Sequence, residues 1–236
     1  MVTEQRERAV VVTDRSEIDQ KLGGGIPVGS LTLVEGVSDG GKSVLVQHFA
    51  YGALMNRLQV AYYTTENTVR SLLTQMESLG LEVTDYFLLD RFRIYPLRVS
   101  QETPAEEAFR ALLDHFASLP PRFEVLIVDS ITHLVTHSGE TQVLDFFSAC
   151  KDLCDKGRTL FLVVHSYAFD EKMLIRVRSV CDAHLRLKME QVGERLAKML
   201  EVLKVRNADR MTGNVISFEV EPQIGMRIIP ISRAKA

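Results

Sequence analysis

The segment Gly36–Ser43 constrains this chain more than any other, because it matches the pattern GxxxxGK[ST] at every defined position. Glycines let backbone N–H groups turn inward around phosphates, Lys42 reaches the β and γ phosphates, and Ser43 offers a hydroxyl to Mg²⁺. Such a loop needs a strand before it and a helix after it, which the apolar run Leu31–Glu35 and the periodic segment Ser43–Arg57 predict. The predicted nucleotide-binding residues are therefore Gly36, Val37, Ser38, Asp39, Gly40, Gly41, Lys42 and Ser43.

Length and charge limit what else the chain can be. Its 236 residues, of which 46% are hydrophobic, can bury a large core. No internal repeat or Pro/Gly-rich linker divides them, so we expect a single domain over residues 1–236. Lys and Arg total 28 against 31 Asp and Glu, giving a formal charge of −3. A dedicated nucleic-acid binder needs a basic face, so we expect no nucleic-acid partner.

The cysteines and the apolar runs bear on the compartment. The three cysteines are an odd number, and Cys150 and Cys154 lie in a segment predicted to be helical. This favours a reduced, cytoplasmic protein over a disulfide scaffold. The runs Val125–Val128 and Leu160–Val164 are far shorter than the roughly 20 residues that cross a bilayer. The first residues also lack the features of a signal peptide. We therefore expect no direct membrane insertion, and membrane association only through a partner.

Short apolar runs alternate with segments of helical periodicity, which predicts an α/β fold with a mainly parallel sheet flanked by helices. Two helices are predicted to end at Gly80 and Gly157, where a left-handed cap forms most easily. A third is predicted to begin at Thr103, with Pro104 in the first helical position and Glu106 completing a capping box. Besides Leu31–Glu35, parallel strands are expected at Val60–Thr65, Val125–Val128 and Thr159–Val164.

The last third of the chain has a different pattern. Four β-like runs follow one another with no helical segment between them. Hairpin-length connections cannot join parallel strands, so this pattern predicts an antiparallel C-terminal extension of the sheet. Its strands are expected at Ala183–Met189, Leu196–Val205, Val215–Val220 and Met226–Ile229.

Three polar residues follow predicted strands, at the edge where ligands of open α/β sheets gather. Asp129 ends a buried apolar strand, and because a phosphate-binding loop precedes it in the chain we assign it to Mg²⁺ through a water molecule. Glu66 either orients a water for attack on the γ-phosphate or is a surface acid before a helix, and the sequence supports both equally. His165 is either a sensor of the nucleotide state or a polar cap on its strand.

The assembled pattern resembles the RecA/KaiC superfamily of ATPases. The lead-in Leu22–Glu35 (LGGGIPVGSLTLVE) is similar to the KaiC-type approach to the phosphate loop, and Gly225–Pro230 is similar to its closing strands. In that superfamily a K-x-R pair reaches the nucleotide of the adjacent subunit in a ring. The resemblance thus implies a homo-oligomeric ring and trans-acting roles for Lys204 and Arg206. Two basic residues at this spacing equally fit one exposed face of a strand.

Within the superfamily, the segment Thr64–Gly80 (TTENTVRSLLTQMESLG) and the single short domain resemble the FlaH family, the accessory ATP-binding proteins of the archaellum motor. The resemblance covers essentially the whole chain. It implies ATP and Mg²⁺ as cofactors, and a cytoplasmic location at the inner face of the membrane. The partners that it implies are the hexameric archaellum motor ATPase, a membrane platform protein and cytosolic motor-ring components. It also implies a role in archaeal motility.

One departure from the family pattern bears on catalysis. KaiC-type domains commonly carry two adjacent glutamates after the second strand, whereas this chain has Glu66 and Asn67. Asparagine cannot accept a proton as a carboxylate does. We therefore predict an ATP-binding regulatory subunit with weak or no hydrolysis that controls the interaction with the motor ATPase. The alternatives are a ring-forming ATPase whose turnover a partner stimulates, and a RecA-like DNA-handling protein, which the charge balance disfavours.

Overall fold

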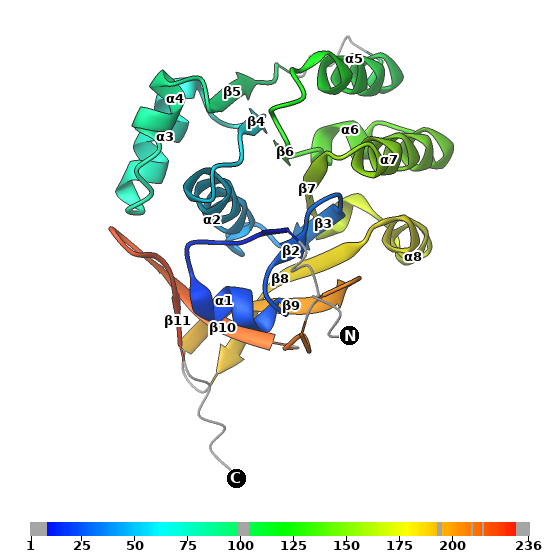
Figure 1. The fold of residues 1–236 in the computed structure, drawn as a ribbon. Helices are drawn as coiled ribbons and strands as arrows, with labels where there is room; N and C mark the ends of the chain where they lie inside the picture. The colour runs from blue at the N-terminus through cyan, green and yellow to red at the C-terminus, as the bar shows by residue number, and fades with distance from the viewer. Residues whose placement is uncertain (1–8, 99–103, 193–194, 209, 214, 230–236) are drawn as a thin grey trace, which may run out of the picture.

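A nine-stranded sheet forms the centre of the computed structural model, which describes residues 9–98, 104–192, 195–208, 210–213 and 215–229. In chain order the strands are β3 (Leu31–Gly36), β4 (Val60–Thr64), β5 (Phe92–Pro96), β6 (Val125–Asp129), β7 (Thr159–His165), β8 (Ala183–Val192), β9 (Arg195–Val205), β10 (Val215–Glu221) and β11 (Gly225–Ile228). Across the sheet the order is β11-β10-β9-β8-β3-β7-β6-β4-β5 (Figure 1). A separate ribbon pairs β1 (Val10–Val11) with β2 (Ile26–Pro27).

Strand direction divides the sheet into two parts. The strands β3, β7, β6, β4 and β5 pair in parallel, and β8 also runs parallel to β3. From β8 onward each pairing is antiparallel. The predicted α/β fold, with a mainly parallel sheet and antiparallel C-terminal strands, is confirmed. In a parallel sheet the carboxyl ends of neighbouring strands share one edge, so β3, β4, β6 and β7 bring their following residues together there.

Two layers of helices cover the sheet (Figure 1). On one face lie α1 (Ser16–Lys21), α2 (Lys42–Met55), α3 (Val69–Ser78) and α4 (Thr84–Leu88). On the other lie α5 (Ala105–Ser118), α6 (Thr132–Thr136), α7 (Glu140–Asp155) and α8 (Glu171–Val180). Helices on both faces require strands that are apolar on both sides, which explains why β6 is buried at all of its residues.

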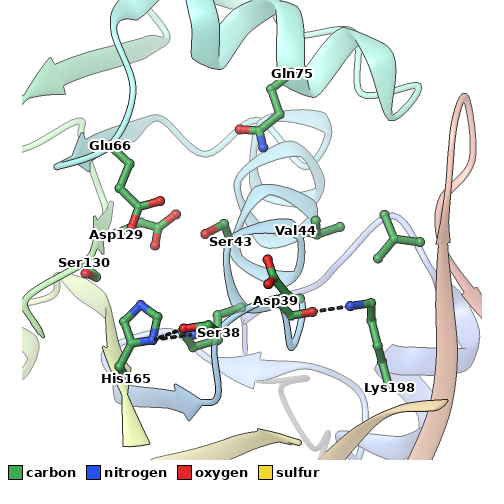
Figure 2. A pocket seen from close by; sticks show the side chains of 13 residues that line it. Ser38, Asp39, Ser43, Val44, Glu66, Gln75, Asp129, Ser130, His165 and Lys198 are labelled. Atoms are coloured by element: carbon green, nitrogen blue, oxygen red, sulfur yellow. Dashed lines mark hydrogen bonds between the residues drawn. The ribbon is translucent and has the colours of Figure 1, made fainter. Parts of the chain in front are cut away.

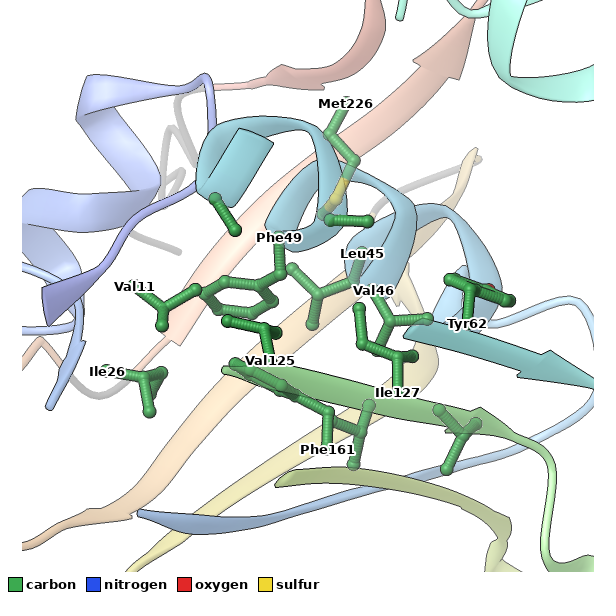
Figure 3. Packing of buried hydrophobic residues seen from close by; sticks show 14 of the residues in the cluster. Val11, Ile26, Leu45, Val46, Phe49, Tyr62, Val125, Ile127, Phe161 and Met226 are labelled. Carbon is green, nitrogen blue, oxygen red and sulfur yellow. The ribbon is translucent and has the colours of Figure 1, made fainter. Parts of the chain in front are cut away.

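The core beneath α2 anchors this helix on the sheet (Figure 3). Phe49 of α2 packs on Phe161 of β7, with ring centroids 4.7 Å apart, and both side chains are fully buried. Burying one such ring contributes about 1.5–3 kcal/mol. Because α2 starts directly after the phosphate loop, this packing also fixes the position of the loop relative to β7.

The left-handed caps at Gly80 and Gly157 are confirmed, with φ of 76° and 99°. The predicted start of the third helix is wrong in one respect. Pro104 has an extended ψ of 135° and precedes the first helical residue, Ala105, instead of occupying the first helical position. The capping partner Thr103 lies outside the described residues.

Two structural observations bear on the predictions that were made from the cysteines and the apolar runs. Cys150, Cys154 and Cys181 are buried free thiols that pack with apolar side chains. In the described part of the chain, no helix combines the length and the apolar character that crossing a membrane requires.

Candidate nucleotide-binding site

The loop after β3 lies tightly against the C-terminal strands. A Cβ on Gly36 would come 2.4 Å from the carbonyl oxygen of Leu187, so only glycine fits this close approach. Gly41 has a φ of 94°, and a Cβ there would also lie 3.0 Å from the Phe218 ring. Helix α2 begins at the next residue. Its first N–H groups lack partners within the helix, and its positive dipole end faces the loop, which favours an anion there.

Lys42 lies at the start of α2 with its side chain folded back over the loop. Its ammonium group donates to the Val37 carbonyl over 2.7 Å and lies 3.4 Å from Nδ1 of His165. Only 6% of Lys42 is exposed. Burial lowers the pKa of Lys42, and the carboxylates of Asp129 and Glu66 act in the opposite direction. The ammonium is thus a partly desolvated cation, whose attraction for phosphate is stronger than in water.

Asp129 ends β6 beside Tyr62 of β4, whose hydroxyl donates to Oδ2 over 2.8 Å. Burial raises the pKa of Asp129, and hydrogen bonds from Tyr62 and Ser43 act in the opposite direction. The fold therefore joins the two residues that the sequence assigned to the metal. A carboxylate and a hydroxyl suit Mg²⁺, which takes one or two protein carboxylates and completes its shell with water and phosphate oxygens. Within the described residues no cluster of three or more His, Cys, Asp or Glu forms a closed metal site.

Glu66 and His165 face the same cavity as the loop (Figure 2). The register pairs Thr64 with Asp129, which sets Glu66, two residues further on, beside Asp129. Nδ1 of His165 lies 3.5 Å from the Ser38 hydroxyl, and burial followed by the charge of Lys42 lowers the pKa of His165. The cavity measures about 440 Å³ and is lined by Ser38, Asp39, Gly41, Lys42, Ser43, Val44, Glu66, Gln75, Asp129, Ser130, His165, Lys198 and Val220.

Lys204 and Arg206 do not reach this cavity within one chain. Lys204 lies opposite His184 near the start of β8, at the sheet edge away from the loop. Its ammonium donates to the Arg178 carbonyl over 2.8 Å, and thereby caps the C-terminal end of α8. Arg206 lies 3.8 Å from Asp182 and is half-exposed. The structure thus separates this pair from the other predicted site residues.

Five lining residues were missed by sequence reasoning. Val44 and Ser130 adjoin predicted site residues and could have been found from that position. No sequence motif points to Gln75, which is one of several polar residues on α3. Lys198 and Val220 come from β9 and β10, and only the strand order brings them to the loop.

Comparison with known proteins agrees with this geometry. Residues 11–233 match the family described as "ATPase: KaiC". The archaeal flagellar ATP-binding protein FlaH of Methanocaldococcus jannaschii is 30% identical over 226 residues, covering 94% of this chain and 96% of the relative. The chain belongs to the FlaH family of KaiC-type ATPases. The FlaH protein of Sulfolobus acidocaldarius is 29% identical over 232 residues, 96% of this chain and all of that one.

A solved FlaH structure extends the agreement to the fold. The crystal structure of flagellar accessory protein FlaH from M. jannaschii superposes with a TM-score of 0.84 at 28% identity, over 95% of this chain and 100% of that chain. The resemblance stated from the sequence is confirmed. Membership of this family of phosphate-loop ATPases implies nucleotide binding, usually with Mg²⁺.

Proposed function

We propose that this chain binds ATP with Mg²⁺ and acts as a regulatory subunit of the archaellum motor, with slow or no hydrolysis of its own. The observation that carries the proposal is the convergence of Lys42, Ser43 and Asp129 on one cavity beside the loop. The loop N–H groups and Lys42 would hold the phosphates, while the Ser43 hydroxyl and Asp129, through water, would hold the metal. Mg²⁺, when bound, neutralises charge on the β and γ phosphates.

The surroundings of Glu66 support slow hydrolysis. The next residue, Asn67, accepts a hydrogen bond from the Ser71 hydroxyl over 3.1 Å at the start of α3. Its side chain thus helps to cap the helix. Proton acceptance from an attacking water therefore rests on Glu66, because Asp129 is assigned to the metal.

The place of action is proposed from the relatives, which are named archaeal flagellar ATP-binding proteins. The partners that we propose are the hexameric motor ATPase, the membrane platform protein and the cytosolic motor-ring components, at the inner face of the membrane. Bound ATP would shift this chain toward the state that its partners prefer. The size of that shift is limited by the difference in ATP affinity between the two states.

Phosphate release tests the proposal. We expect the isolated chain to turn over ATP well below the roughly 1 s⁻¹ at the lower end of ordinary enzymes. Glu66→Gln should lower the residual rate about tenfold or more and leave ATP affinity within about twofold, because general-base action is lost while the phosphate contacts remain. Glu107→Gln, an exposed site on α5, is the matched control. Rapid turnover by the isolated wild type would contradict a regulatory subunit.

The alternative of a ring ATPase is favoured by the position of Arg206 at the sheet edge away from the loop. In a head-to-tail ring, that edge of one protomer can face the cavity of the next. We expect ATP to promote ring assembly in analytical ultracentrifugation, and Arg206→Ala to lower the assembled fraction severalfold. Arg227→Ala is the matched control, since the two arginine side chains are 50% and 52% exposed. Assembly of Arg206→Ala at the wild-type level would rule out the trans contact.

A further inference from the structure

Three neighbouring C-terminal strands touch the phosphate loop. The Val37 N–H donates to the Leu187 carbonyl of β8 over 3.2 Å, and the Phe218 ring of β10 packs against Gly41. Between these strands, the ammonium group of Lys198 on β9 donates to the Asp39 carbonyl. The first two contacts are backbone or apolar, so Lys198 alone of the three brings a charge to the loop.

Among the described residues, that charge has no acidic partner. No described carboxylate forms an ion pair with Lys198, and its ammonium also lies 3.9 Å from the Met189 sulfur. Lys188 on β8 differs, because it pairs with Glu201 over 2.6 Å and also with Glu190. An ammonium carries three donors, and a neutral carbonyl leaves its charge uncompensated. A half-buried cation of this kind on a cavity wall favours a bound anion.

The cavity separates this cation from the acidic residues. Figure 2 shows Lys198 on one side of the loop, and Glu66 and Asp129 on the other. The Lys42 ammonium lies at the loop, 3.4 Å from Nδ1 of His165. Mg²⁺ belongs with the carboxylates. A polyphosphate that extends along the loop, away from the acidic residues that would hold Mg²⁺, therefore passes toward Lys198.

We propose that Lys198 is a second cationic contact for the polyphosphate of the bound nucleotide, made within the same chain, and that it couples occupancy of the cavity to β9. The inference rests on the proposed ATP binding and extends it. From Lys198 to Lys204, β9 spans about 20 Å, at 3.3–3.4 Å per residue. One strand thus links the cavity to the sheet edge that carries Lys204 and Arg206. When the Lys198 ammonium contacts both the loop and a phosphate, the position of β9 depends on whether the ligand is bound.

Calorimetric titration of ATP into wild type, Lys198→Gln and Lys198→Arg tests the contact. We expect Lys198→Gln to weaken ATP binding about 10-fold or more, as for loss of a hydrogen bond to a charged group. Lys198→Arg should retain most of the affinity, because it keeps the charge. Inorganic tripolyphosphate, measured by competition, should lose affinity by the same factor, because the contact is to phosphates. The matched control is Lys188→Gln, which should bind as wild type does.

Hydrogen exchange distinguishes a Lys198 that contacts phosphate from a Lys198 that only holds the loop against β9. In the wild type, we expect ATP to slow exchange at the amides of residues 196–202, and saturating ATP to protect them less in Lys198→Gln. A lysine that only braces the loop would lower the melting temperature without nucleotide but leave the affinities for ATP and tripolyphosphate unchanged. Lys198→Gln binding within about twofold of wild type would overturn the inference. Failure of the wild type to bind ATP would overturn the proposed function together with it.

Discussion

Replacing Lys42 by alanine is expected to weaken ATP binding by roughly 100-fold or more. Only 6% of Lys42 is exposed, and its ammonium group lies beside the Val37 carbonyl and His165, where water competes weakly for its hydrogen bonds to phosphate. Removing a charged donor from such a site leaves the anion without its partner. Burial already disfavours the charged form of this lysine, as its lowered pKa indicates, so we expect its loss to leave the fold intact.

The measurement is a titration of a fluorescent ATP analogue followed by anisotropy, at fixed ionic strength because phosphate contacts depend on salt. Lys156→Ala, an exposed lysine after α7, removes the same charge at a distance from the cavity. Thermal unfolding of each variant without nucleotide confirms that it is folded. Equal affinity of Lys42→Ala and wild type would refute binding of nucleotide at this loop.

Local spacing explains what the sequence could predict. The phosphate loop, the adjoining β3 and α2, and the acid that ends β6 depend on patterns a few residues long. Asp129, which the sequence assigned to Mg²⁺, lines the same cavity as Ser43, because the carboxyl ends of parallel strands share one edge. Its protonation environment could not be foreseen, since Tyr62 reaches it from a strand 67 residues away in sequence.

Strand order and register explain most of what the sequence left open or missed. Glu66 faces the cavity because β4 pairs with β6, and Lys198 contacts Asp39 across 159 residues of sequence because β9 lies two strands from β3. Neither of these strand pairings can be deduced from the residues around Glu66 or Lys198 in the sequence. The edge strand β5 was not predicted, because it is only five residues long and Arg93 interrupts its apolar run. The short helix α6, Thr132–Thr136, is too brief for a helical period to show.

The predicted start of α5 was wrong for a more local reason. Proline fits the first turn of a helix, but Pro104 has the extended ψ of a residue that precedes the helix. Composition alone does not distinguish these two positions. At the other end of α5, Leu119 is extended with a ψ of 139°, because the following Pro120 disfavours a helical conformation.

Asp129→Asn is expected to remove most of the gain in ATP affinity that Mg²⁺ provides. Carboxylates that position a metal or its water ligands affect metal affinity by about 10- to 100-fold, and the amide removes the charge at almost constant shape. Calorimetric ATP titrations with Mg²⁺ and with EDTA measure this gain directly.

Tyr62→Phe is the companion variant to Asp129→Asn, because it keeps the carboxylate and deletes only the hydroxyl that donates to it over 2.8 Å. We expect a smaller loss of the Mg²⁺ effect there, since this hydrogen bond stabilises the ionised acid whose pKa burial raises.

Asp129→Asn also relieves the cost of a buried charge, so its melting temperature without nucleotide should stay level or rise. If Asp129 holds the metal, Asp129→Asn therefore lowers the Mg²⁺-dependent ATP affinity without lowering the melting temperature. A variant that unfolds earlier yet keeps the full Mg²⁺ effect would assign Asp129 to the fold instead.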